Sequence, residues 1–171
     1  MKKSRRVDVL QNEEARVLRQ AYLDRFVDTR SEFYREHVAT RCKYSDGLRY
    51  DGYIWDCLKN ATPITYAEFC GVVQGLARVV AMADDHSRDK VIGPPLWPYP
   101  PYSVVSLSGD LLLQLMPALP EDIYVFDRTV SWTLVLTHEH DGQERICLKV
   151  GAQSMEDPTF QGCLRAPDAA R

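Results

Sequence analysis

Several features that mark common functional classes are missing from this chain. Its five cysteines include no CxxC pair, and the two nearest, Cys57 and Cys70, lie 13 residues apart. This spacing argues against a disulfide framework or a zinc site, so we expect reduced thiols in a cytosolic protein. No GxGxxG, P-loop or GxSxG motif occurs, which removes the usual sequence signatures of nucleotide binding and serine hydrolysis.

An excess of positive charge is also missing. The chain carries 21 lysines and arginines against 24 acidic residues, with a net charge of −3. Nucleic acid is therefore not an expected partner, because phosphate binding needs a basic field. No apolar run is long enough to span a bilayer, and the basic residues 1–6 are not followed by the apolar segment of a signal peptide. We expect no membrane partner.

What the chain does have is the composition of a globular α+β domain. It has 171 residues, of which 45% are hydrophobic and 26% charged, as is typical of one domain. We expect a flexible basic tail over 1–10, a single α+β domain over 11–151, and an irregular C-terminal tail over 152–171. The domain is predicted to hold a mostly antiparallel sheet of about four to six strands, packed by two longer helices and one short helix.

Helices are predicted in three places. Apolar residues recur on one side over about 12–37, with Asn12 as the N-cap and a break near 29–31. Thr65 and Glu68 form a capping box that opens a second helix. A short apolar helix is expected directly after Ser108.

Strands are predicted at four β-rich runs, residues 103–108, 122–126, 131–139 and 145–150. The run 79–85 favours a buried strand, and a helix remains the alternative. The run 53–58 is either a short strand or a packed loop. Five of the ten prolines fall in 93–102, which we expect to be a rigid loop.

An Asp-Gly pair at 141–142 predicts a tight hairpin between the last two strands. The implied register places Leu136 opposite Cys147 and His138 opposite Arg145. Both faces of this hairpin have apolar character in the middle, so we expect it to be covered on both sides.

The two histidines near the hairpin tip allow two interpretations. His138 and His140 share a face of the predicted strand, roughly 7 Å apart at twice the rise per residue. One interpretation is a metal site that adds His86 as a ligand, with His86 or Glu139 as the acid–base group. The other is a solvated hairpin end, which Arg145 across from His138 favours because a cation beside a metal ion is unfavourable. We expect the solvated end, with no metal, no cofactor and no catalytic residue.

Acidic residues after the run 79–83 are candidate contacts for a protein partner. Asp84, Asp85 and Asp89 lie where functional groups often gather, and an acidic surface attracts a basic partner. The alternative is an ordinary solvated loop of mixed charge.

Aromatic residues on rigid loops are the other candidate contacts. Trp97 and Tyr99 lie in the proline-rich loop, and Tyr53 and Trp55 follow an Asp-Gly turn. Such side chains lose little entropy on binding and so make good contact surface. The alternative is that they pack onto the sheet as a lid.

The segment 122–142, DIYVFDRTVSWTLVLTHEHDG, resembles a stretch of small bacterial cytosolic proteins, with a weaker likeness over 79–89. The residues that carry the likeness are Phe126, Asp127, Trp132, Thr133, Thr137, His138 and Glu139. The resemblance implies a similar fold and a bacterial cytosol. Because those proteins have no established activity, it implies no mechanism.

By elimination, the sequence favours a non-catalytic protein-binding module of the bacterial cytoplasm. An immunity-type protein or an adaptor that binds a basic partner protein fits its size and acidity. The alternative is a small metal-assisted hydrolase that uses His138 and His140. The sequence does not indicate the oligomeric state.

Overall fold

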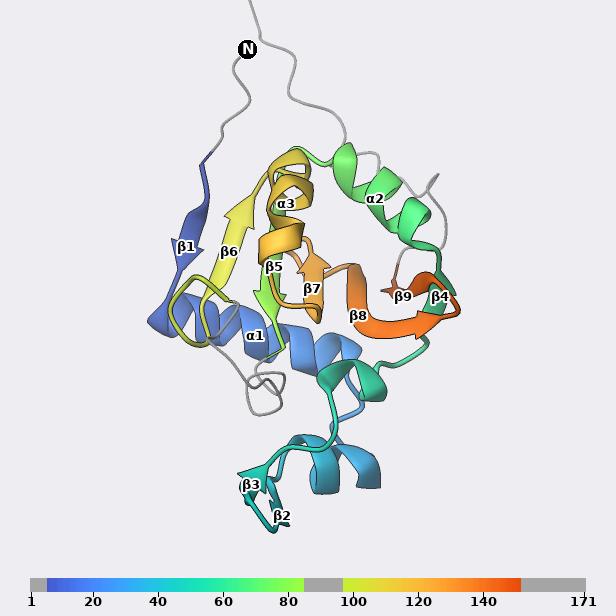
Figure 1. Cartoon of the computed structure of the whole chain (residues 1–171). Coiled ribbons are helices and arrows are strands. Elements are labelled where there is room, and N and C mark those ends of the chain that lie inside the picture. The colour runs from blue at the N-terminus through green and yellow to red at the C-terminus, as the bar shows by residue number, and fades with distance from the viewer. Residues whose placement is uncertain (1–5, 85–96, 152–171) are drawn as a thin grey trace, which may run out of the picture.

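The computed structural model describes residues 6–84 and 97–151, and its centre is one large antiparallel sheet. Its strands are β1 (Asp8–Leu10), β4 (Thr62–Ile64), β5 (Val79–Ala83), β6 (Val104–Leu107), β7 (Ile123–Phe126), β8 (Thr133–Asp141) and β9 (Glu144–Val150). They lie in the order β1-β6-β5-β7-β8-β9-β4, and every neighbouring pair is antiparallel (Figure 1). The predicted α+β class with a mostly antiparallel sheet is confirmed. The sheet has seven strands instead of four to six, because three-residue strands pair at both edges.

The helices and a separate two-stranded hairpin make up the rest of the described chain. They are α1 (Asn12–Phe26), the π-helix η1 (Tyr34–Val38), the hairpin of β2 (Cys42–Tyr44) and β3 (Gly47–Arg49), the 3₁₀-helices η2 (Ile54–Cys57) and η4 (Met116–Ala118), α2 (Tyr66–Gln74) and α3 (Gly109–Leu115). Figure 1 shows η1, β2 and β3 together at the lower end of the view, apart from the seven-stranded sheet. None of the helices in the described ranges is long and apolar enough to cross a membrane.

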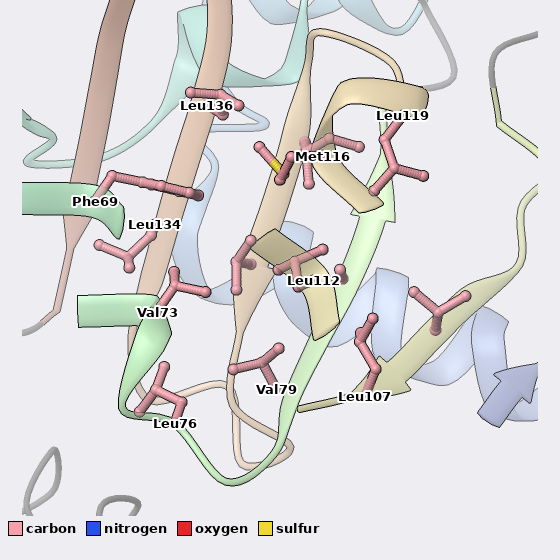
Figure 2. Packing of buried hydrophobic residues seen from close by; sticks show 14 of the residues in the cluster. Phe69, Val73, Leu76, Val79, Leu107, Leu112, Met116, Leu119, Leu134 and Leu136 are labelled. Carbon is pink, nitrogen blue, oxygen red and sulfur yellow. The ribbon is translucent and has the colours of Figure 1, made fainter. Parts of the chain in front are cut away.

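One face of the sheet is covered by α2 and α3. Side chains alternate along a strand, so β5 sends Val79 and Ala81 to this face and Val80 to the other. Figure 2 shows the apolar layer that results, with Phe69 and Val73 of α2, Leu112 of α3, and Leu134 and Leu136 of β8. All of these side chains are buried.

The other face is covered by α1 and η2. Tyr22 is fully buried, and its ring centroid lies 5.0 Å from Phe26 and 5.4 Å from Tyr124 of β7. Its hydroxyl hydrogen-bonds the hydroxyl of Thr133 at 3.1 Å. Because both faces are covered, the central strands have continuous apolar sequences instead of alternating ones. For the same reason, the sequence pattern of 79–85 also fitted a buried helix. The preferred strand interpretation of that run is confirmed by β5.

The long N-terminal helix is broken, as predicted, but its start differs. α1 ends at Phe26 because Val27 is extended, and η1 begins only after Ser31, whose hydroxyl accepts from the amide of Tyr34. The N-cap is Gln11, and Asn12 has a φ of 51°, so the prediction of Asn12 as N-cap was wrong. Residues 8–10 form β1 rather than part of a tail, whereas 1–5 and 152–171 lie outside the described residues.

The start of α2 and the run 53–58 were also predicted from the sequence. The capping box is confirmed: the amide of Glu68 donates to the hydroxyl of Thr65 at 3.1 Å, and the amide of Thr65 donates to the Glu68 carboxylate at 2.8 Å. The run 53–58 forms the 3₁₀-helix η2 and packs against α1, which is closer to the packed loop than to the strand.

The C-terminal hairpin follows the predicted register only at its base. Leu136 pairs with Cys147 as predicted, but His140 pairs with Arg145, because β8 bulges between Leu136 and His140. The prediction that His138 lies opposite Arg145 was therefore wrong. A bulge inserts residues into one strand and re-aims the side chains beyond it.

Candidate functional site

The end of β5, the start of β7 and the bulged part of β8 meet and bring acidic and aromatic groups together. Asp84 follows β5 and Asp122 precedes β7, and the amide of Asp84 donates to the carbonyl of Asp122 at 3.1 Å. β8 lies on the other side of β7, and the amide of His138 donates to Oδ1 of Asp122 at 3.1 Å. The antiparallel pairing of β5, β7 and β8 thus places these three residues side by side.

Asp122 also holds the imidazole of His138. Nδ1 of His138 lies 2.9 Å from Oδ1 and 3.2 Å from Oδ2 of Asp122. The Asp122 side chain is 4% exposed and that of His138 is 32% exposed. The carboxylate fixes the ring through Nδ1, so Nε2 is the nitrogen that remains available to a ligand.

The prediction of a solvated hairpin end is therefore wrong for His138, which the bulge turns onto a buried carboxylate. It describes His140 better, since that residue is exposed and its Nδ1 lies 3.0 Å from the carbonyl of His138. Arg145 donates instead to the carbonyls of Thr137 and Glu121, both at 2.6 Å.

Asp84 lies behind this pair and is 1% exposed. Its carboxylate accepts hydrogen bonds from the hydroxyl of Tyr124 and, at 3.0 Å, from the amide of Ile54. Burial, with the nearby Asp84 charge, raises the pKa of Tyr124 well above its ordinary value, so this hydroxyl stays protonated and donates. Asp84 therefore anchors η2 to the sheet, and its side chain is not accessible to a partner, contrary to our expectation.

Two aromatic rings from η2 and its N-cap lie over the histidine. Tyr53 and Trp55 stack with centroids 5.4 Å apart and planes at 14°, and the centroid of His138 lies 4.7 Å from Tyr53. The indole Nε1 of Trp55 donates to Oδ1 of Asp122 at 3.1 Å, and its amide donates to the hydroxyl of Tyr124 at 3.0 Å. Tyr53, Trp55 and His138 are half-buried, and we call these three residues the aromatic patch.

Negative charge surrounds the aromatic patch. Partial burial, and then the charges of Asp122, Asp84, Asp56 and Glu121, raise the pKa of Tyr53 to about 12. Asp56 and Glu121 are exposed, and Asp56 accepts a hydrogen bond from the amide of Tyr53 at 2.8 Å. The patch therefore combines flat aromatic surface with a negative potential.

The described residues place His138 and His140 in no group that could hold a metal ion. Within the ranges 6–84 and 97–151, the only group of three metal-ligating side chains close enough to hold an ion is His37, Cys42 and Asp51. His138 and His140 are not part of it. His86 lies outside the described residues, and Glu139, the other acid–base candidate, has an exposed side chain.

Of the other predicted partner contacts, two aromatic residues pack onto the domain and two acidic residues are not described. Trp97 is buried, and its Nε1 donates to the hydroxyl of Ser103 at 3.1 Å. Tyr99 is half-buried and lies edge-on to Trp97, with centroids 5.1 Å apart. Both pack against the α2–α3 face, as the lid alternative supposed. Asp85 and Asp89 lie outside the described residues.

Sequence reasoning missed Asp122 and Tyr124 as site residues. Asp122 lies directly before β7 and Tyr124 lies within it, and because this strand has the apolar pattern of core, neither residue gave a signal of its own. Tyr53 and Trp55 were noted as aromatic residues beside a turn, but their proximity to His138 comes only from the tertiary fold.

Comparison with protein-family models, with curated proteins and with solved structures found no match to this chain. The likeness of residues 122–142 to small bacterial proteins therefore stays a prediction.

Proposed function

We propose that this protein is a binding module for a basic partner protein, and that the aromatic patch receives a lysine or arginine side chain of that partner. The observation that supports this proposal is the stacked pair Tyr53 and Trp55 with His138 beside it, in the field of several carboxylates. A cation over an aromatic face is attracted by the ring quadrupole. Nearby carboxylates strengthen this attraction and favour encounter with a basic surface.

The patch is already ordered for binding. Trp55 is held by two hydrogen bonds, through its amide to Tyr124 and through its indole to Asp122. Tyr53 is held at its amide by Asp56. A ligand would therefore not have to order these side chains, which lowers the entropic cost of binding.

We propose, more specifically, an immunity-type protein or an adaptor of the bacterial cytoplasm. The overall acidity of the chain and its resemblance to small bacterial proteins support it. The contact surface differs from the one expected from the sequence, since Asp84 and Trp97 are buried.

The experiment compares capture of partners from the native cell by charge-matched variants. We expect the wild-type protein to retain a basic protein at low salt. Tyr53→Ala and the double variant Asp56→Asn/Glu121→Gln should lose it. The control Glu13→Gln/Glu32→Gln removes the same number of exposed charges elsewhere and should retain it.

A titration with a short arginine-rich peptide tests the recognition chemistry directly. Because Trp97 and Trp132 are buried, a change in indole fluorescence reports mainly on Trp55. Equal binding by the patch variants and the control, or capture of an acidic partner, would overturn the proposal.

A second function is favoured by the contact between Asp122 and His138. The carboxylate of Asp122 binds Nδ1 of His138 and leaves Nε2 on the opposite side of the ring. A histidine that acts as a general base is oriented in this way, so a hydrolase is the alternative. For the metal-assisted form, His138→Ala and His140→Ala would both remove stoichiometric metal from the purified protein. We expect neither variant to change the metal content. If both variants lost the metal, the hydrolase would become the favoured function in place of the binding module.

A further inference from the structure

The lobe formed by residues 31–52 contains a second cluster of reactive side chains, separate from the aromatic patch. His37 comes from η1, Cys42 opens β2, and Asp51 follows β3. One ligand atom from each residue lies within 4.8 Å of the other two. These residue types supply one imidazole nitrogen, one sulfur and one carboxylate oxygen to a common point.

The backbone is built to bring these three together. The amide of Gly52 donates to the carbonyl of His37 at 3.0 Å, which places Asp51 beside the imidazole. A Cβ on Gly52 would lie 2.9 Å from the side chain of Val38 and 3.0 Å from that of Phe33, so any larger residue would require these side chains to shift. His37 itself lies on a π-helix, a rare element that occurs often at functional sites.

The imidazole of His37 points at the carboxylate of Asp51. Nδ1 of His37 lies 2.8 Å from Oδ1 of Asp51. The thiol of Cys42 lies 3.5 Å from the carbonyl of Glu36. The side chains of His37 and Asp51 are thus already in contact, and a ligand atom of Cys42 lies within 4.8 Å of both.

We propose that His37, Cys42 and Asp51 bind a zinc ion, with the fourth coordination position open to water or to an external ligand. Zinc accepts imidazole nitrogen, thiolate sulfur and carboxylate oxygen as ligands, and three protein ligands with one open position occur in catalytic zinc sites, whereas calcium and magnesium require oxygen ligands. Zinc would displace the proton that lies between His37 and Asp51, and the thiol of Cys42 would release its proton to solvent. Ligand atoms in a tetrahedral site lie roughly 3.3–3.8 Å apart, so His37 and Asp51 need to separate only slightly from their present 2.8 Å.

The ion would hold together a lobe that has little apolar core of its own. Among residues 31–52, Val38 and Gly52 are the only buried ones. Figure 1 shows that the lobe stands away from the main sheet. An ion bound by residues from η1, β2 and the segment after β3 would cross-link these elements, and metal binding of this kind adds to folding stability. The lobe also ends directly before Tyr53, so zinc would steady the chain that leads into the aromatic patch.

The experiment uses the full chain, purified without a histidine tag and stripped with a chelator. Calorimetric titration with zinc chloride should show one ion per chain. Titration with cobalt chloride should give the thiolate-to-cobalt charge-transfer band in the near ultraviolet. Cys42→Ser should abolish that band, and His37→Ala and Asp51→Asn should each weaken zinc binding about ten-fold or more.

Two controls separate this site from adventitious binding. Cys70→Ser removes another half-buried thiol, and His140→Ala removes an exposed imidazole, so both should bind zinc as the wild type does. Zinc should raise the melting temperature of the wild type and leave that of Cys42→Ser unchanged, and circular dichroism of the metal-free forms verifies that each variant is folded. A charge-transfer band that persists in Cys42→Ser, or binding that is weakened equally by the controls, would overturn the proposal.

Discussion

Asp122 accepts at one oxygen, Oδ1, from the amide of His138, from its ring nitrogen Nδ1 and from the indole of Trp55. A single buried carboxylate thus fixes the bulged strand β8 and the helix η2 in relation to each other. Charge-assisted hydrogen bonds of this kind are shorter and stronger than neutral ones. Asp122 therefore acts as the centre of the candidate site.

Asp122→Asn should lower the free energy of unfolding by about 1.5–3 kcal/mol, because a neutral amide replaces a buried acceptor of several charge-assisted bonds. Urea denaturation followed by circular dichroism measures the change. His138→Ala removes only the imidazole from the hydrogen-bond partners of Asp122, and this ring is partly exposed. We therefore expect it to lower the free energy of unfolding by less than Asp122→Asn does. If Asp122→Asn were as stable as the wild type, the carboxylate would not hold the site together.

Tyr124→Phe should also be destabilising, by about 1–3 kcal/mol. It removes the hydroxyl that donates to Asp84 and accepts from the amide of Trp55, and so leaves a buried carboxylate short of a donor. Tyr22→Phe is the matched control, since the hydrogen bond of its buried hydroxyl within the described residues is to the neutral hydroxyl of Thr133. The same urea titration should show a smaller loss for the control. The reverse order of the two losses would contradict the role given to Asp84.

The fold was largely predictable because its signals are local or periodic. The capping box at Thr65 and Glu68 gives the start of α2, and β-rich runs give β6 to β9. The edge strands β1 and β4 were missed because each has only three residues and no period of its own. Their pairing depends on neighbours that are remote in sequence.

The candidate site was much less predictable. An Asp-Gly turn predicts pairing along the whole hairpin, and nothing in the sequence marks the bulge between Leu136 and His140. That bulge decides whether His138 meets Arg145 or Asp122. The zinc ligands were missed for a similar reason, since Cys42 and Asp51 do not form a CxxC or HxH pattern and meet only through the close approach at Gly52.

Gly109→Ala should destabilise the protein by about 3 kcal/mol or more. A Cβ at this position would lie 1.7 Å from the carbonyl oxygen of Val73, so α2 and α3 would have to move apart. Gly71→Ala lies inside α2 with open space around it and should stabilise by up to about 1 kcal/mol, because alanine favours a helix. Thermal unfolding of both variants measures the difference. Equal effects would mean that the two helices do not approach as closely as described.

Alkaline pH should reveal the negative field around Tyr53. Its pKa is raised to about 12 in the folded protein, first by partial burial and then by nearby carboxylates, whereas an unfolded tyrosine titrates near its ordinary value of about 10. Between these values the unfolded chain has lost a proton that the folded chain keeps. The contribution of Tyr53 to stability is therefore complete below pH ~10 and is lost as the pH rises through about 12.

Urea titrations at a series of alkaline pH values measure this loss. The wild type should lose stability with pH more steeply than Tyr53→Phe, which cannot ionise at this position. Glu121→Gln removes one of the charges that raise the pKa and should also flatten the slope, whereas the distant Glu13→Gln should leave it unchanged. If Tyr53→Phe followed the wild-type slope, the carboxylates would not act on this ring. The aromatic patch would then lack the field that the binding of a cation requires.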